Sequence, residues 1–171
     1  MEVFACLLRS MLIPSPGKEF YCADYAQVEA RLAFWVAEHE EGLKAFREGR
    51  KLYEEMAAET FHMNLKDVKK DSLERYIGKT AILGAQYGCG STKFMQQCHK
   101  QGRTEVTEEM ARKAIYTYRK VHHPVPTLWH NLEQAAIKAI LNPGSRHQLN
   151  KVTIYKRGDF LNIKLPSGRR L

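Results

Sequence analysis

The sequence predicts a mostly helical α+β fold, and three observations support this prediction. Apolar residues recur at helical spacing in successive segments between residues 27 and 141. The segment 148–170 instead alternates apolar and polar residues around Arg157-Gly158-Asp159, which is typical of a β-hairpin. Near the start, residues 19–24 (EFYCAD) form a short aromatic-rich run that predicts a buried strand. We therefore expect a helical body with a strand at each end.

The expected elements follow one another without long linkers or internal repeats. A turn at residues 14–17 (PSPG) precedes the first strand, and from Gln27 the apolar spacing becomes helical. Further helices are predicted at residues 40–49, 51–62, 71–87, 91–101, 108–121 and 125–141. The last helix is expected to stop at Asn142-Pro143-Gly144, and a turn is expected at Pro166-Ser167-Gly168 after the hairpin.

Length and composition limit the class of protein. The 171 residues suit one compact domain, and 44% hydrophobic with 27% charged residues is ordinary for a globular chain. Disordered and fibrous classes are thereby excluded.

The cysteines and the first residues bear on the cellular compartment. Cys6, Cys22, Cys89 and Cys98 form no CxxC pair and have no histidine at zinc-ligand spacing, so free thiols in a reducing compartment are expected. Residues 1–13 are apolar, but Glu2 and Arg9 argue against a signal peptide or a membrane span. These features predict an intracellular protein without a membrane partner.

The net charge of +8 is unevenly distributed. Residues 1–68 carry 8 Lys+Arg and 12 Asp+Glu, whereas residues 69–171 carry 19 and 7. A basic surface of this kind favours a polyanionic partner such as nucleic acid, because binding releases counterions from the phosphates. A basic solvated face without a ligand remains an alternative.

The first stretch whose residues could take part in catalysis or binding is DYAQVEAR, residues 24–31. A carboxylate at the end of a buried strand is held by the backbone, which suits a hard cation such as Mg²⁺, and the Tyr25 carbonyl offers a second oxygen. The alternative is that Asp24 only caps the helix that begins near Gln27.

The second stretch is RYIGKTAILGAQYG, residues 75–88. On a continuous helix, four-residue steps would place Arg75, Lys79, Leu83 and Tyr87 in one stripe. Two cations followed by apolar and aromatic surface would suit a nucleoside triphosphate bound lengthwise. A helix with an exposed basic end and a buried apolar end is the alternative.

Together, the two stretches resemble motifs A and B of the DNA polymerase I family, the family A polymerases, in their order and their separation of about fifty residues. The family's motif A reads Asp-Tyr-Ser-Gln-Ile-Glu-x-Arg, and its motif B reads Arg-x-x-x-Lys-x-x-x-aromatic-Gly-x-x-Tyr-Gly. The flanking segments 43–49 (LKAFREG) and 165–171 (LPSGRRL) are similar to the family's as well. The phage-type members are the most similar.

The resemblance implies a division of the chain. Residues 1–36 correspond to part of the palm with motif A, and residues 37–142 to the helical fingers with motif B on the helix 71–87. Residues 143–171 correspond to a β-hairpin and the start of the return to the palm. The chain is then a fragment whose thumb and remaining palm are missing.

The resemblance also implies roles for individual residues. Asp24 would be the first of two aspartates that hold two Mg²⁺ ions, with the Tyr25 carbonyl as a further ligand. Arg75 and Lys79 would contact the triphosphate, and Lys79 would protonate the pyrophosphate leaving group. The other expected nucleotide-binding residues are Glu29 as the gate against a 2′-hydroxyl, Tyr87 near the templating base, and Gln27, Tyr53 and Leu83. Two of these depart from the family pattern: Tyr53 stands where many cellular members have histidine, and Leu83 replaces an aromatic residue.

The family's second metal-binding aspartate has no counterpart in this sequence. The four aspartates are Asp24, Asp67, Asp71 and Asp159, and none follows a histidine. The resemblance therefore implies a template-directed DNA polymerase that acts on primer-template DNA and dNTPs in the cytoplasm of a bacterial or phage-infected cell. It also implies that this chain needs the rest of the polymerase and is inactive alone.

Two other functions remain open at this point. A non-catalytic helical module that binds nucleic acid would use the same basic half of the chain. A single-subunit RNA polymerase has related motifs, but Glu29 argues against it because such an enzyme must admit the 2′-hydroxyl.

Overall fold

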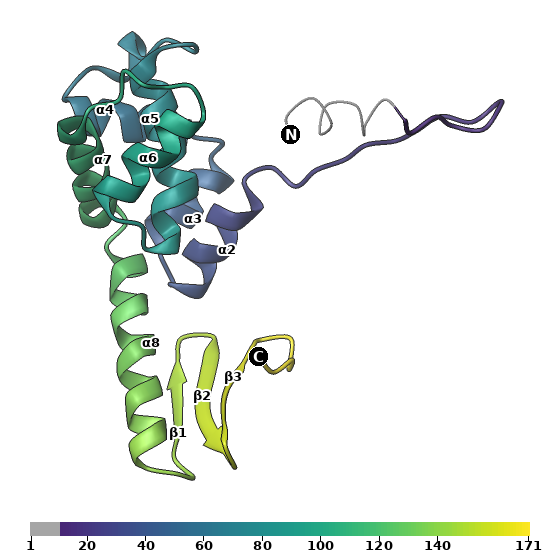
Figure 1. Cartoon of the computed structure of the whole chain (residues 1–171), viewed down its shortest axis with the longest axis vertical. Coiled ribbons are helices and arrows are strands. Elements are labelled where there is room, and N and C mark those ends of the chain that lie inside the picture. Colours follow the sequence, from purple (N-terminus) through teal and green to yellow (C-terminus); the bar gives the residue numbers. More distant parts are fainter. Residues whose placement is uncertain (1–10) are drawn as a thin grey trace.

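The computed structural model describes residues 11–171 (Figure 1). Cys6 and most of the apolar segment 1–13 lie outside the described residues. Within the described residues, no helix combines the length and the apolar character needed to cross a bilayer.

The α+β prediction is confirmed, with helices dominating the described residues. Six helices form a compact head, and a longer one extends away from it (Figure 1). The head contains α2 (Val28–Val36), α3 (Glu40–Arg47), α4 (Leu52–Phe61), α5 (Leu73–Gly84), α6 (Ser91–Lys100) and α7 (Glu108–Val121), and the longer helix is α8 (Pro124–Leu141). Short 3-10 turns occur at η1 (Leu65–Asp67) and η2 (Ala85–Tyr87).

The ends of the helices follow local chemistry. The Ser72 hydroxyl accepts a hydrogen bond from the Arg75 amide at 3.2 Å and caps α5, and Thr107 caps α7 in the same way. The predicted helix 71–87 is too long, because α5 ends at Gly84 and the chain tightens into η2. Gly84 weakens the helix and Gly88, at φ 75°, ends η2 in a left-handed conformation.

Two apolar clusters hold the head together. The larger is centred on Ile77 and Ile82 of α5, which pack with buried residues of α4, α6 and α7. The smaller joins Phe34 of α2 to Leu52 of α4 and to Val125 and Leu128 at the start of α8. Because α2 contributes to both clusters, the helix that follows Asp24 is fixed to the helical head.

The C-terminal part of the chain forms an arm, made of α8 and a three-stranded sheet. Strands β1 (Arg146–Leu149), β2 (Val152–Arg157) and β3 (Phe160–Lys164) are antiparallel in that order. The predicted hairpin is β2–β3, which pairs Arg157 with Phe160 around the turn, and β1 extends it. The predicted turn at 166–168 is also present, since the Gly168 amide donates to the Leu165 carbonyl at 2.9 Å.

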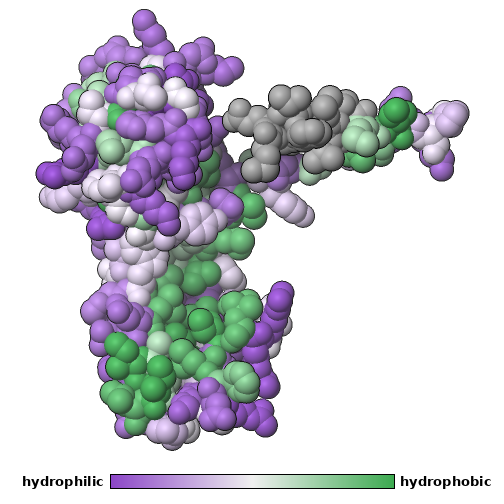
Figure 2. Space-filling model, in the orientation of Figure 1, coloured by the Kyte–Doolittle hydropathy of each residue, from purple (hydrophilic) through white to green (hydrophobic). Residues whose placement is uncertain are grey.

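The arm is held to the head near one end of the sheet. Asn150, in the turn between β1 and β2, donates its side-chain amide to the Val36 carbonyl at 3.1 Å. The Lys151 ammonium lies 3.3 Å from Glu38 and 5.2 Å from the centre of the Trp35 ring. Figure 2 shows hydrophobic residues gathered over the arm, where Ile137, Ile140 and Leu141 are exposed, whereas the head is more hydrophilic on this face.

The strand predicted at residues 19–24 is wrong. Residues 18–25 have no regular structure, and Phe20 and Tyr21 are 63% and 93% exposed. An aromatic run forms a strand only where a neighbouring strand accepts its backbone hydrogen bonds, and no described residue pairs with this segment. Figure 1 shows the segment extended outside the head and leading back to it at α2.

A buried histidine pair lies where α7 meets α8. Nε2 of His39 is 2.9 Å from Nδ1 of His122, one ring donating its N–H to the other, and the Phe34 ring stacks on His122. Burial lowers the pKa of His122 to about 3 and also lowers the pKa of His39. Both rings are therefore neutral in the folded chain near pH 7.

This pair makes stability depend on pH. Below the ordinary histidine pKa of 6.5 the unfolded chain takes up protons that the folded chain excludes, so we expect stability to fall as pH decreases. His122 alone should remove about 2 kcal/mol between pH 6.5 and 5. Urea denaturation across this range measures the slope. His122→Phe should flatten it and the exposed His130→Gln should not, so equal slopes in all three proteins would contradict the assignment.

Candidate nucleotide site

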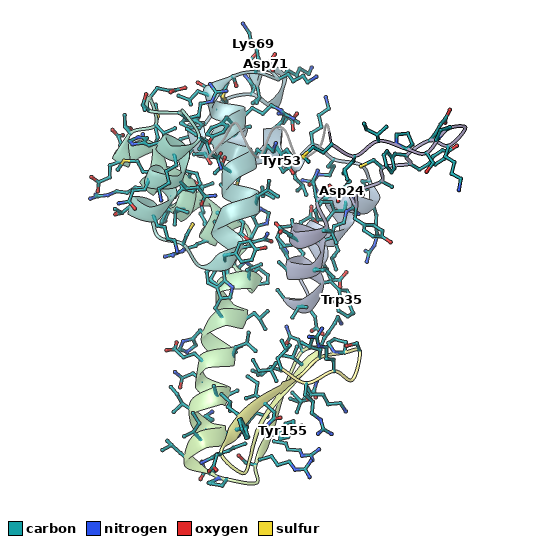
Figure 3. The ribbon with its side chains drawn as sticks, turned by 45° about the vertical axis from the view of Figure 1, so that its right-hand side comes forward. Asp24, Trp35, Tyr53, Lys69, Asp71 and Tyr155 are labelled. Carbon is teal, nitrogen blue, oxygen red and sulfur yellow. The ribbon has the colours of Figure 1, made fainter. Side chains whose placement is uncertain are left out.

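Three adjoining hollows lie beside α5 and contain the residues that the sequence singled out. The first, the Asp24 hollow, has a volume of about 320 Å³ and is lined by Asp24, Tyr25, Gln27, Val28, Glu29, Tyr53 and Leu83. It joins the chain that leads into α2 to residues of α4 and α5. Figure 3 shows Asp24 and Tyr53 in this region of the head.

A tight turn lies between Asp24 and Glu29, which both line the first hollow. Gln27 adopts a left-handed conformation, with φ 54°, directly before α2, and Arg31 Nε donates back to the Ala26 carbonyl at 2.9 Å. A left-handed non-glycine residue costs on the order of 1 kcal/mol, so the surrounding contacts impose this turn. The Gln27 Oε1 atom is buried without a partner within the described residues. Asp24 does not cap α2, which excludes the helix-cap alternative.

The second hollow, the Lys79 hollow, lies between α5 and α6. It has a volume of about 540 Å³, and Lys79, Leu83 and Tyr87 line it together with Lys93 of α6. Glu29 and Leu83 line both this hollow and the first one, so the two adjoin. A hydrogen bond to the Glu29 side chain raises the pKa of the exposed Tyr87 phenol above its ordinary value.

Arg75 lies outside both of these hollows. Its Nε donates to the Glu54 carboxylate at 2.9 Å, and its guanidinium lies 5.9 Å from the centre of the Tyr53 ring. It lines a third hollow, the Arg75 hollow, of about 530 Å³. Tyr53 belongs to the first hollow, so the Arg75–Tyr53 contact marks the boundary between the first and third hollows.

The structure therefore distributes the predicted site along α5. Eight of the nine predicted residues line the Asp24 or the Lys79 hollow, and Arg75 is the exception. The early end of α5 turns Tyr87 away from the expected straight stripe. Sequence reasoning missed Glu54, which follows Tyr53 and pairs with Arg75, and Lys93 on α6. In the sequence, Glu54 is only a carboxylate on the predicted helix that precedes motif B. No local pattern indicates that it pairs with Arg75.

The residues around Asp24 fit part of a Mg²⁺ coordination shell. The Asp24 carboxylate and the Tyr25 carbonyl are hard oxygen donors, the type that Mg²⁺ prefers. Among residues 11–171, no three His, Cys, Asp or Glu side chains are grouped closely enough to hold a metal ion. The described residues thus offer one anchoring carboxylate and not a complete site.

Comparison with known proteins agrees with the motifs. The family model for DNA polymerase family A matches residues 3–157. The chain belongs to DNA polymerase family A. It is 32% identical over 170 residues to the DNA polymerase of Bacillus phage SP02, an alignment that covers 99% of this chain and 26% of the phage protein. It is 28% identical over 112 residues to DNA polymerase I of Geobacillus stearothermophilus, covering 65% of this chain and 12% of that protein.

A solved structure of a polymerase domain supports the fold. The POL domain of Pol1 from M. smegmatis, in complex with DNA primer-template and dNTP, aligns with a TM-score of 0.51 at 22% identity. The alignment covers 68% of this chain and 19% of that one. The family A chain described here thus spans about a quarter of the length of its phage relative.

Proposed function

We propose that this chain provides the nucleotide-binding part of a template-directed DNA polymerase, which transfers dNTPs to a primer 3′ end. The observation that carries the proposal is the meeting of Asp24 and Glu29 with Tyr53 and Leu83 around one hollow. These residues come from the motif A segment, α4 and the motif B helix. Membership of the family and the primer-template and dNTP bound to the M. smegmatis relative support the same substrates here.

Lys79 and Arg75 are proposed to bind the triphosphate. Lys79 is exposed on α5 one turn from Leu83, so its ammonium is free to approach an anion over the second hollow. In that position it neutralises phosphate charge and gives a proton to the leaving pyrophosphate. Arg75 contributes a planar guanidinium suited to phosphate oxygens, after release from Glu54.

The other residues are proposed to select and orient the nucleotide. Leu83 faces both hollows and offers apolar surface to the sugar and base. Glu29, held by Tyr87, occupies the space that a 2′-hydroxyl would need, while Tyr87 and Tyr53 offer aromatic surface and Gln27 an unpartnered amide oxygen. Mg²⁺ held by Asp24 and the Tyr25 carbonyl would stabilise charge on the transferred phosphoryl group.

The proposed enzyme needs further parts. Residues 1–36 are assigned to the palm, 37–142 to the fingers and 143–171 to the hairpin that leads back to the palm. Its partners are primer-template DNA, a dNTP, and the thumb and remaining palm, which supply a second aspartate. The cytoplasm of a bacterial or phage-infected cell is the proposed compartment, because the relatives are phage and bacterial polymerases.

Primer extension tests this proposal directly. A chimera in which this chain replaces the aligned segment of the SP02 polymerase should extend a primer with Mg²⁺. The isolated chain should not, because its described residues offer Asp24 but no complete metal site. As an independent readout, dNTP should shift the NMR signals of Leu83 and Tyr87 in the isolated chain. DNA binding without either effect would favour the non-catalytic module instead.

A further inference from the structure

A fourth hollow lies beside α4, and none of the roles given above uses it. Its volume is about 420 Å³, within the range of about 300–1,000 Å³ that is typical of small-molecule sites. It opens between α4 and the end of α7, which lie side by side in the head (Figure 1). We call it the Met56 hollow; the lining residues that matter most are Leu52, Met56, Ala58, Glu59, Val121 and His122.

The Met56 hollow is separate from the candidate nucleotide site. The α4 residues Tyr53 and Ala57 face α5, where their backbone groups approach Gly78. Glu55 and Glu59, which line the Met56 hollow, lie on the opposite side of α4 by helical spacing. A ligand in this hollow therefore leaves the three hollows beside α5 free.

The deepest part of the hollow is apolar and belongs to the core. Met56 is 3% exposed and packs in the larger apolar cluster of the head, and Leu52 is 5% exposed and packs in the smaller one. Met63, Leu65 and Val121 continue the apolar lining, and the last two are exposed. The hollow is thus formed before a ligand enters, which lowers the cost of binding an apolar group there.

The rim of the hollow is negatively charged, in contrast to the basic chain as a whole. Arg50 lines the hollow, but its guanidinium donates to both carboxylate oxygens of Glu55 at 2.8 Å and also donates to Glu41. Its single positive charge is therefore outweighed by two carboxylates. Glu59 is exposed and takes part in no ion pair within residues 11–171. This rim attracts a cation and repels phosphate groups.

A buried histidine ring offers a second point of attachment. His122 is 4% exposed and lines the hollow, and its Nδ1 shares a hydrogen bond with His39. Its other ring nitrogen, Nε2, has no hydrogen-bond partner within residues 11–171. In the tautomer in which Nδ1 donates to His39, Nε2 accepts a hydrogen bond, which an ammonium group can supply. We propose that the Met56 hollow binds a small organic amine, whose apolar body covers Met56 and whose ammonium group pairs with Glu59 and His122.

Methyl NMR of the 171-residue chain labelled at methionine tests the proposal, with phenethylamine as the probe. The signals of Met56 and Met63 should shift, whereas those of Met95 and Met110, which do not line the hollow, should not. Phenethyl alcohol and hydrocinnamate keep the aromatic ring without the positive charge, so they should bind roughly fivefold more weakly or worse. Absent binding, equal affinities for the three probes, or shifts confined to Met95 and Met110 would overturn the proposal.

Variants of the chain locate the bound amine. Glu59→Gln should weaken phenethylamine binding roughly fivefold and leave the affinity for phenethyl alcohol unchanged. The matched control Glu133→Gln removes the same charge from an exposed position on α8 outside the hollow and should change the affinity less than about twofold. Ala58→Leu fills the hollow and should abolish binding of both probes, with Met95 and Met110 signals like the parent's showing that the variant is folded. Equal losses in Glu59→Gln and Glu133→Gln contradict the assignment.

Two further ligands exclude other occupants. Nα-acetyl-lysine methylamide carries its ammonium group on a peptide unit, so tighter binding of it than of phenethylamine would assign the hollow to a lysine of a partner protein and overturn the small-molecule proposal. Displacement of phenethylamine by dATP would also overturn it, because the rim should repel phosphates. None of these measurements uses primer extension, so failure of this site is distinguishable from failure of the proposed polymerase role.

Discussion

Asp24→Asn in the chimeric polymerase is expected to lower kcat for dNTP incorporation by roughly a thousandfold or more, the scale seen when one charge-stabilising group is removed from a phosphoryl-transfer site. The substitution keeps the size of the side chain. It removes one of the two carboxylates, Asp24 and Glu29, that line the first hollow. Binding of primer-template DNA should change little, because the basic half of the chain is untouched. Single-turnover incorporation with Mg²⁺ measures the chemical step separately from DNA binding.

Asp159→Asn is the matched control for this experiment. It makes the same change in charge and size at an exposed turn of the arm, and Asp159 lines none of the three hollows. We expect its kcat to stay within twofold of the parent. An Asp24→Asn enzyme with a parental kcat would show that Asp24 has no part in metal binding.

The elements that the sequence predicted well depend on local interactions. The helix ends are confirmed to within two residues, except for the C-terminal end of α5, and a cap or a proline defines some of them, as at Ser72 and Pro124. The β2–β3 hairpin is likewise set by its own turn at Gly158, with φ 59°. In each case the residues that decide the structure are close together in the sequence.

The errors concern interactions between distant segments. The run at 19–24 has the composition of a strand, but pairing with another strand decides whether it forms one, and the composition of a segment does not show whether such a neighbour is present. The sequence identifies the motif residues. It does not predict their distribution over three hollows, because that depends on where α5 ends and on packing between helices. The Glu54–Arg75 ion pair joins residues 21 apart in the sequence, and only the contact between α4 and α5 brings them together.

That contact depends on Gly78, which lies where α5 crosses α4. A Cβ atom at this position would collide with the Tyr53 carbonyl and approach the Ala57 amide to 2.9 Å. These two backbone groups are four residues apart in α4, the spacing of its helical hydrogen bonds, so neither can move without disrupting that helix. The absence of a side chain at residue 78 therefore sets the distance between the two helices.

Gly78→Ala is consequently expected to destabilise the chain by about 3 kcal/mol, at the upper end of overpacking costs. Gly84→Ala is the matched control on the same helix, because nothing lies within 4 Å of its added methyl group. It should stabilise the chain by up to about 1 kcal/mol through helix propensity. Urea denaturation measures both, and similar values for the two variants would show that α4 and α5 are not in close contact. Because Tyr53 and Glu54 move with the α4 backbone, Gly78→Ala should also weaken the pairing of Glu54 with Arg75, which couples the packing of these helices to the site.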